Sequence, residues 1–333
     1  MNYVLGVDQG HTETRAAVAD MEGNILGVGK TYGACHSLHG LDQAMGAVQE
    51  ASQMALSQAG VSLRQLALMF CGLTGADWPD EYHLLETNVL SLGLCRDVYI
   101  KNDSIVALRG GTSASYGAIV IGGTGGNCAI RSPQGEEFIF HYYHDRDLQG
   151  GLGLGWRSLR AIYRAETGRE PDTLLKPRVL AMMGLATVDD LLRADVEQRL
   201  SLDDVKHIAP LVFQAAYEGD RVACEIIRAF GEGLAELVIA GLRRFDMTRL
   251  DVEVVLSGSI FKATGNLVQE VMIAGIHLAA PNARLVNARY EPVVGAVLLG
   301  LEASGVQVDE RVKRNIEGSS QALCLIRLPD QSS

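Results

Sequence analysis

The chain has 333 residues, 47% of them hydrophobic and 21% charged, which predicts about two globular domains with sizeable cores. Its net charge of −11 argues against a general nucleic-acid-binding or anionic-membrane surface, because such surfaces are basic. The six cysteines form no C-x-x-C pair, which disfavours a zinc site and favours reduced thiols in a cytoplasmic protein. The sequence indicates neither a signal peptide nor a membrane-spanning run of about 20 apolar residues.

The first fifteen residues predict a hairpin whose turn could bind a ligand. Two apolar runs, 3–7 and 14–19, flank a turn that contains Asp8, Gly10 and Thr12. Gly10 has no Cβ and permits close backbone approach, Asp8 could hold hydrated Mg2+, and Thr12 could donate to a phosphate. An ordinary hairpin explains the same residues, because Asp and Gly are common in turns.

The rest of the first half predicts a mostly parallel sheet with a hairpin edge. In chain order the predicted elements are a strand at 25–30, a helix at 41–59 ended by Gly60, a buried strand at 66–71, a helix starting at Pro79, a strand at 98–101 and a helix at 104–109. The order βββαβαβα is typical of such α/β sheets. Small and polar residues at 110–115 mark the best domain boundary.

The second half opens like the first, with a hairpin around a glycine and threonine turn. The predicted elements are strands at 116–121, 127–131 and 136–142, helices at 152–167, 174–217 with breaks, and 220–245, then a strand at 252–256, a helix at 267–278, a strand at 283–286 and a helix at 292–301. We interpret the shared opening as weak internal repetition, two halves of one ancestral domain. The polar tail beyond 306 is expected to cross back to the first half.

Five motifs together resemble the N-acetylglucosamine kinase and BadF/BadG/BcrA/BcrD-type ATPase family of the actin/hexokinase/Hsp70 superfamily. They lie at residues 5–10, 72–77, 102–103, 122–127 and 291–296. The resemblance implies an α/β fold with two ribonuclease H-like, actin-like ATPase domains and a nucleotide cleft between them. With the boundary at the small and polar residues, the domains are expected at 1–112 and 113–306, with the tail at about 307–333 packed on the first.

The resemblance also implies an ATP-dependent kinase that phosphorylates a hydroxyl of a small sugar or amino sugar, similar to N-acetylglucosamine or glucosamine kinases. A homodimer and a cytoplasmic location are implied as well. Asp8 would position Mg2+. The residues expected to bind ATP are Gly10, His11, Thr12, Gly123, Thr124, Gly125, Asn127, Gly258 and Ser259. Those expected to bind the sugar are Cys35, His36, Thr74, Gly75, Asp77, Asp103 and Asp147.

Asp103 is the predicted general base. It follows the strand at 98–101, and ligands of such sheets bind at the carboxyl ends of the strands. A sugar hydroxyl is a poor nucleophile, and a carboxylate within hydrogen-bond reach can orient it and accept its proton late in phosphoryl transfer. Alternatively, Asp103 caps the helix that follows it. Both roles can hold together.

The chain departs from the family pattern at the sugar end. Cys35 stands where the family kinases have an asparagine, and the segment 146–151 keeps Asp147 but lacks a glutamate. Such groups discriminate strongly between sugars, so their loss puts N-acetylglucosamine itself in question as the acceptor. Ser259 replaces a second glycine, a minor change. Four histidines also lie in this region, where polar lining of a ligand pocket is favoured over a metal site: His36, His39, His141 and His144.

Two other functions fit the same fold. One is an ATPase that drives a partner redox enzyme through a shared iron–sulfur cluster, but Cys128 and Cys224 are not spaced in a recognisable version of that pattern. The other is a nucleotide-binding regulatory or sensor protein without sugar kinase activity, which the missing sugar-contacting residues would suit.

Overall fold

The computed structural model describes residues 3–327, which form two compact units. Within that range, unit 1 contains residues 3–117, 133–136 and 286–327, and unit 2 contains residues 118–132 and 137–285. Each unit has its own five-stranded mixed sheet with helices packed on it. The predicted α/β class and the two-domain actin-like fold are confirmed.

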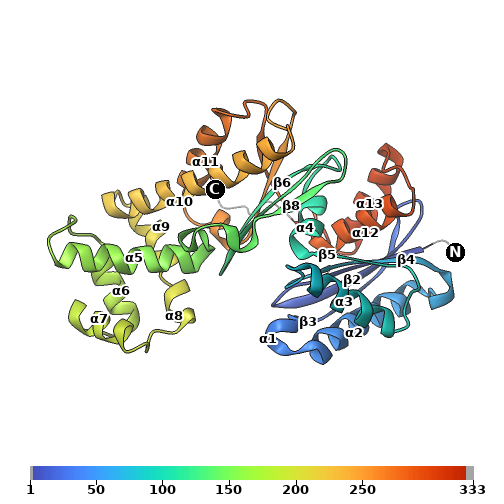
Figure 1. Cartoon of the computed structure of the whole chain (residues 1–333), viewed down its shortest axis with the longest axis horizontal. Helices are drawn as coiled ribbons and strands as arrows, with labels where there is room; N and C mark the ends of the chain where they lie inside the picture. Colours follow the sequence, from blue (N-terminus) through green and yellow to red (C-terminus); the bar gives the residue numbers. More distant parts are fainter. Residues whose placement is uncertain (1–2, 328–333) are drawn as a thin grey trace. The chain divides into compact units, whose positions relative to one another are not determined.

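Unit 1 is built on a sheet with the strand order β3-β2-β1-β4-β5 (Figure 1). The antiparallel strands are β1 (Tyr3–Gln9), β2 (Glu13–Asp20) and β3 (Ile25–Tyr32), and the strands that continue in parallel from β1 are β4 (Leu66–Leu73) and β5 (Val98–Asn102). The observed order is the predicted one, because each apolar run of strand length is separated from the next by a turn or a helix.

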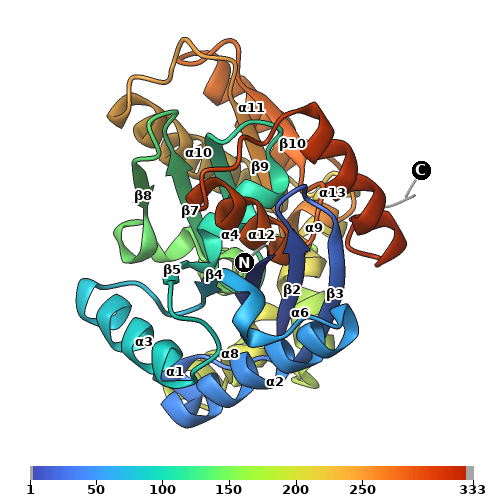
Figure 2. The same ribbon diagram turned by 90° about the vertical axis from the view of Figure 1, so that its right-hand side faces the viewer.

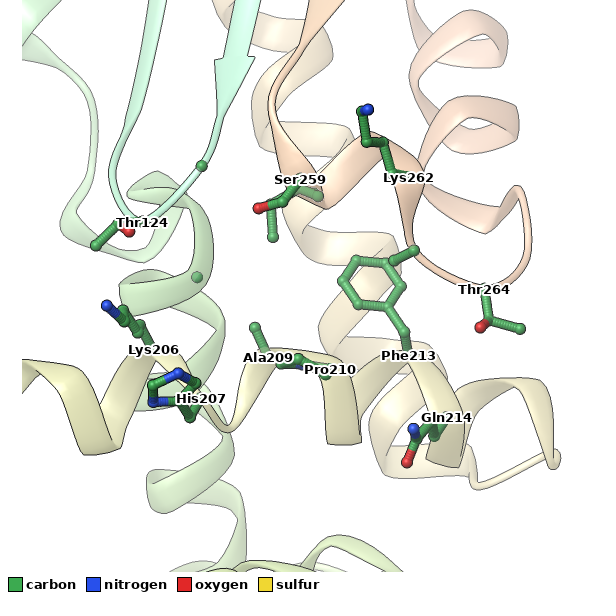
Figure 3. Close-up of a pocket in the computed structure, with 14 residues that line it drawn as sticks. Thr124, Lys206, His207, Ala209, Pro210, Phe213, Gln214, Ser259, Lys262 and Thr264 are labelled. Atoms are coloured by element: carbon green, nitrogen blue, oxygen red, sulfur yellow. The ribbon is translucent and has the colours of Figure 1, made fainter. Parts of the chain in front are cut away.

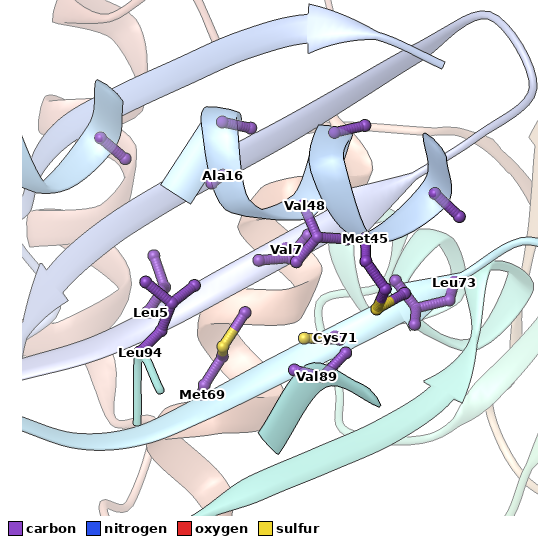
Figure 4. Close-up of a cluster of buried hydrophobic side chains, with 14 of the residues drawn as sticks. Leu5, Val7, Ala16, Met45, Val48, Met69, Cys71, Leu73, Val89 and Leu94 are labelled. Carbon is purple, nitrogen blue, oxygen red and sulfur yellow. The ribbon is translucent and has the colours of Figure 1, made fainter. Parts of the chain in front are cut away.

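Helices bury both faces of this sheet. One face carries α2 (Leu41–Ala59) and α3 (Pro79–Ser91), and the other carries α12 (Pro292–Ala303), with α4 (Asp103–Gly111) and α13 (Glu310–Ala322) beside it (Figures 1 and 2). Successive strand residues point to opposite faces. Leu5 and Val7 therefore pack under α2 with Met45 and Val48 (Figure 4), while Val4 packs with α12.

Helix α12 lies in unit 1, whereas the sequence interpretation assigned residues 113–306 to the second domain. The helix packs on β1 and α4. Glycine makes both contacts possible, because a Cβ on Gly6 would lie 2.6 Å from the Val297 nitrogen and one on Gly295 would lie 1.8 Å from the Val106 oxygen. This close approach depends on tertiary packing, which a linear boundary signal does not report.

Unit 2 repeats the topology of unit 1. Its sheet has the order β10-β9-β6-β7-β8, so that β6 to β10 correspond one by one to β1 to β5. The strands are β6 (Gly117–Gly122), β7 (Gly126–Arg131), β8 (Glu137–Ile139), β9 (Glu253–Ser257) and β10 (Arg284–Asn287). The shared order supports an internal duplication. The predicted strand at 136–142 is too long, because His141–Tyr143 form a 3-10 turn.

The helices of unit 2 cover its sheet and extend beyond it. They are α5 (Gly150–Glu166), α6 (Leu175–Met183), α7 (Val188–Val196), α8 (Leu202–Lys206), α9 (Ala209–Tyr217), α10 (Arg221–Arg244) and α11 (Leu267–His277). The long α10 contacts β7, α9 and α11. Over residues 3–327, no helix is both long and apolar enough to cross a membrane.

Two helical glycines give a matched test of the α12 contact. We expect Gly295→Ala to lower the free energy of unfolding by about 1–3 kcal/mol, because its Cβ would overlap the α4 backbone. Gly318→Ala, where a Cβ would meet no described atom within 4 Å, should instead stabilise α13 by up to about 1 kcal/mol. Urea denaturation of both variants measures the difference, and equal effects would contradict the packing argument.

Candidate functional site

Three parallel strands of unit 1 end side by side. In the pairing of β1 with β4, Asp8 lies opposite Gly72 and Gln9 opposite Leu73, and in the pairing of β4 with β5, Leu73 lies opposite Asn102. The loops that follow the three strands therefore leave from one edge of the sheet. The Thr74 N–H donates to the Gln9 oxygen at 2.9 Å and fixes two of these loops together.

Asp103 is the first residue of α4, and its neighbour Asn102 caps the helix. The Asn102 Oδ1 accepts from the Ser104 N–H at 3.0 Å. The alternative in which Asp103 is the N-cap is therefore wrong, although its carboxylate also interacts with the Ser104 N–H. Burial raises the pKa of Asp103 to about 6, with a further upward contribution from Asp77, while His11 and a hydrogen bond to Thr74 oppose the rise.

Residues from two loops pack around Thr74, next to Asp103. The Thr74 Oγ1 lies 3.2 Å from His11 Nδ1, and the Cys35 thiol points to the Thr74 carbonyl oxygen at 3.7 Å. Cys35 is 2% exposed. Gly75 has φ = +80°, and a Cβ there would lie 2.7 Å from the Cys35 sulfur, so only glycine fits this turn without displacing Cys35.

His36 and Asp77 complete this group. The His36 Nε2 lies 3.6 Å from Glu81 Oε1, whereas its Nδ1 is buried and has no hydrogen-bond partner among the described residues. Asp77 Oδ1 accepts from Asn102 Nδ2 at 2.9 Å. The structure thus brings together all the unit 1 residues predicted to bind the sugar, and we call them the acceptor cluster: Cys35, His36, Thr74, Gly75, Asp77 and Asp103.

Asp147 belongs to unit 2 and is engaged in ion pairs. Its carboxylate oxygens accept from Arg160 Nη2 at 2.6 and 2.5 Å, and Arg157 Nε lies 3.3 Å away. Its predicted contact with the sugar stays a prediction. Any such contact would have to compete with these arginines.

Asp8 lies near the end of β1, in surroundings that disfavour its ionised form. Burial raises its pKa to about 8, and the Asp103 and Glu291 carboxylates raise it further, while Arg327 and Arg15 oppose the rise. A partly buried carboxylate with other carboxylates nearby fits a divalent cation, because Mg2+ prefers carboxylate oxygens. The residues present are therefore compatible with the predicted Mg2+ site.

The turn between β1 and β2 presents the first set of predicted phosphate-binding residues. The Gly10 N–H closes the turn on the Glu13 oxygen at 2.9 Å, and the Thr12 oxygen accepts from the Gly33 N–H at 3.1 Å. His11 and Thr12 are exposed. The backbone of this turn is therefore fixed while its tip stays open to a ligand.

The turn between β6 and β7 is held from two sides. The Gly123 and Thr124 oxygens accept from the Gly151 and Leu152 N–H groups of α5, at 2.8 and 3.0 Å. On the other side Gly258 adopts φ = +108°, and a Cβ there would lie 2.3 Å from the Gly122 oxygen. Close packing of the two glycine turns is thus a property of unit 2 itself.

Asn127 has a structural role in this turn. Its Oδ1 accepts from the Cys128 N–H at 2.8 Å and from the His141 N–H at 3.1 Å. The side-chain oxygen therefore fixes the chain before the 3-10 turn at His141–Tyr143. Its predicted contact with ATP stays a prediction.

A pocket of about 390 Å³ adjoins the second turn within unit 2 (Figure 3). Gly123 is among its lining residues, Thr124 and Ser259 lie on one side of it, and Lys206 and Phe213 of the segment 206–214 lie on the other. The sequence analysis missed the residues of this segment. They come from the broken helices after α5, and no turn or motif distinguishes them there.

The histidines and cysteines form no metal site over residues 3–327, where no group of three or more His, Cys, Asp or Glu side chains could hold an ion. The His144 Nε2 lies 3.0 Å from the Gly126 oxygen and so supports the second turn. None of the six cysteines is in a disulfide, and Cys128 is fully buried.

Comparison with known proteins places these features in a family. The model of the BadF/BadG/BcrA/BcrD ATPase family matches residues 5–300. The N-acetylmuramic acid/N-acetylglucosamine kinase of Clostridium acetobutylicum is 24% identical over 304 residues, covering 90% of this chain and 98% of its own. Glucosamine kinase GspK of Vibrio cholerae is 26% identical over 245 residues, covering 72% of this chain and 80% of its own.

A solved structure agrees with the observed fold. It is the protein of Chromobacterium violaceum described as a "putative N-acetylglucosamine kinase", with a TM-score of 0.67, 23% identity and coverage of 90% of this chain and 99% of that one. At this identity the likeness concerns the fold.

A pair of glycine substitutions tests the second turn. We expect Gly258→Ala to lower the melting temperature, because its Cβ would overlap the Gly122 carbonyl in a backbone conformation that suits glycine. Gly125→Ala meets no described atom within 4 Å, so it should melt as the wild type does. Weaker ATP binding by Gly125→Ala at unchanged stability would show that a ligand approaches this turn, and unchanged affinity would argue against it.

The environment of Asp8 predicts a pH-dependent stability. Because folding raises its pKa to about 8, the folded state takes up a proton, and this stabilisation is lost as the pH rises through about 8. Without Mg2+, Asp8→Asn should therefore be more stable than wild type at pH 9, by about 1 kcal/mol or more, and the difference should be smaller at pH 5, which lies closer to the ordinary aspartate pKa of 3.8. Urea denaturation at both pH values tests this, and equal stability at pH 9 would contradict it.

Proposed function

Because the chain belongs to the BadF/BadG/BcrA/BcrD ATPase family, we propose that it is an ATP-dependent kinase that phosphorylates a hydroxyl of a small sugar or amino sugar. The observation that carries the proposal is the acceptor cluster, in which the buried Asp103 carboxylate at the start of α4 lies beside Thr74, His11 and Asp77. The names of the Clostridium and Vibrio relatives support the same reaction class.

Asp103 is the general base of the proposed reaction. It receives the acceptor hydroxyl as a hydrogen-bond donor, orients it toward the γ-phosphorus and takes its proton as the new bond forms. Its pKa of about 6 leaves it mostly ionised at neutral pH while remaining basic enough to accept a proton. Thr74 holds the carboxylate in place.

ATP is bound by backbone groups rather than by a basic surface, which suits a chain of net charge −11. Each unit has a turn of its own whose backbone suits phosphate oxygens, Gly10–Thr12 in unit 1 and Gly123–Gly125 in unit 2. The adjoining 390 Å³ pocket receives adenosine, with Phe213 and Ile260 as apolar contacts and Ser259 at its rim. Asp8 holds Mg2+, which neutralises phosphate charge when bound.

The acceptor cluster is rich in hydrogen-bond acceptors and is therefore suited to hydroxyl and amino groups. Asp77 and Asp103 offer carboxylates, and the unpartnered His36 Nδ1 offers a buried polar atom that a ligand group would satisfy. Cys35 contributes no amide here, so recognition of an N-acetyl group by a side-chain amide at this position is absent. The proposed acceptor is therefore a sugar or an amino sugar.

Asp103→Asn tests the base. We expect kcat to fall by about 10² to 10⁴ with little change in the melting temperature, because the amide keeps the size of the carboxylate and one of its two acceptor oxygens. For the wild type, kcat/KM should fall as the pH drops below about 6, where Asp103 takes up a proton. Asp80→Asn, an exposed residue of α3, is the control. A loss of less than about threefold would contradict the assignment.

An ADP-release screen over sugars, amino sugars and polyols with Mg2+ identifies the acceptor. ADP that appears in proportion to a phosphorylated sugar supports the kinase. Nucleotide binding without phosphorylated product across the panel would favour a regulatory protein of the same fold. The predicted homodimer can be measured on the same samples by light scattering.

A further inference from the structure

His11 connects the first turn to the acceptor cluster. It stands between Gly10 and Thr12 on the turn, is exposed, and its Nδ1 lies 3.2 Å from the Thr74 Oγ1. The Thr74 side chain in turn hydrogen-bonds the Asp103 carboxylate. A single hydroxyl therefore separates the imidazole from the predicted base.

Cys35 lies close enough to the imidazole for its thiol to influence the His11 pKa. Its thiol interacts with the His11 ring and is itself fixed by the Ser37 Oγ at 3.1 Å and by the Thr74 oxygen at 3.7 Å. Because Cys35 is buried, neighbouring atoms confine its side chain. The ring is thus fixed by two loops, while the residue as a whole remains accessible from solvent.

The groups that face His11 favour its protonated form. They are the Cys35 thiol from the loop after β3, Asp77 from the loop after β4 and Asp103 from the start of α4. The hydrogen bond to Cys35 raises the pKa of His11 most, the two carboxylates raise it further, and burial opposes them. In the protonated ring Nδ1–H donates to Thr74 Oγ1, which leaves the Thr74 O–H to donate to Asp103.

We propose that His11 is a catalytic residue of this kinase, whose imidazolium contacts the phosphoryl group in transfer and, through Thr74, aligns Asp103 with that group. The inference rests on the proposed function, since a phosphoryl group must reach the hydroxyl held at Asp103. The bond from the acceptor oxygen to phosphorus forms as the bond from phosphorus to the ADP oxygen breaks. The acceptor proton passes to Asp103, and His11 keeps its own proton.

The imidazolium stabilises the transition state, because it neutralises negative charge that is spread over the phosphoryl oxygens. A fixed cation costs no reorganisation during the reaction, and here it is fixed by Cys35 and Thr74 before any ligand arrives. Its contribution should therefore appear in kcat more than in the KM for the sugar.

His11→Ala and His11→Asn test the proposal, with His83→Gln on the exposed face of α3 as the matched control. We expect kcat to fall about 10²-fold in both His11 variants, with the sugar KM within about threefold of wild type. Added imidazole should restore at least about tenfold of the lost kcat in His11→Ala and nothing in His83→Gln. A change in KM alone, or no rescue by imidazole in a folded His11→Ala protein, would overturn the proposal.

A binding measurement separates this inference from the proposed function. The affinities of AMPPNP and ADP are compared in wild type, His11→Ala and His83→Gln by calorimetry. We expect His11→Ala to weaken AMPPNP about tenfold or more and ADP less than about twofold. If the wild type phosphorylates no sugar, the proposed function fails. Even then, a lower ratio of AMPPNP affinity to ADP affinity in His11→Ala than in wild type supports the contact between His11 and the terminal phosphoryl group. If this ratio is the same in His11→Ala as in wild type, the proposed contact is overturned.

Cys35→Ala tests how the imidazole is held. If Cys35 acts by positioning His11, its effect on kcat should be absent from a protein that already carries His11→Ala, so the double variant should be as active as His11→Ala alone. Additive losses would show that Cys35 acts independently of His11 and would overturn this part of the proposal.

Discussion

The parallel pairing of β1, β4 and β5 is the constraint on which the acceptor cluster depends. The register sets Gln9 opposite Leu73 and Leu73 opposite Asn102, so three loops begin at one edge of the sheet. A shift of one residue would turn every side chain of a strand to the other face. The α2 and α12 cores on the two faces oppose such a shift, because each accepts only its own half of the strand residues.

Glycines determine how closely the elements of each unit approach. In unit 1, Gly6 and Gly295 let α12 contact β1 and α4, and in unit 2, Gly258 lets one turn contact the carbonyl of Gly122. These contacts place backbone groups where side chains would otherwise intervene. Gly125 also lacks a side chain, and a Cβ there would meet no described atom within 4 Å, so a ligand can approach its backbone.

The polar groups of unit 1 divide into those that build the site and those that are free to act. Asn102 caps α4 and holds Asp77, while Glu81 accepts from the Asp77 N–H and lies near His36. The His36 Nδ1 has no partner among the described residues, and the Asp103 carboxylate lies beside Thr74 and the Ser104 N–H. This division explains how several carboxylates can lie close together: each structural carboxylate or amide is satisfied by a neighbour, while burial raises the pKa of Asp103.

The sequence by itself determined the α/β class, the order of the elements and the family, because strand-length apolar runs, capped helices and glycine turns are local signals. It also indicated Asp8, Thr74 and Asp103, which belong to motifs next to strand ends. Tertiary structure alone decided that Asn102 rather than Asp103 caps α4, that α12 lies in unit 1, that Asn127 and Asp147 are engaged by neighbours, and that Lys206 and Phe213 line a pocket. These facts depend on which distant segments come into contact. The spacing of residues along the chain predicts helices, strands and turns, but it does not predict such contacts.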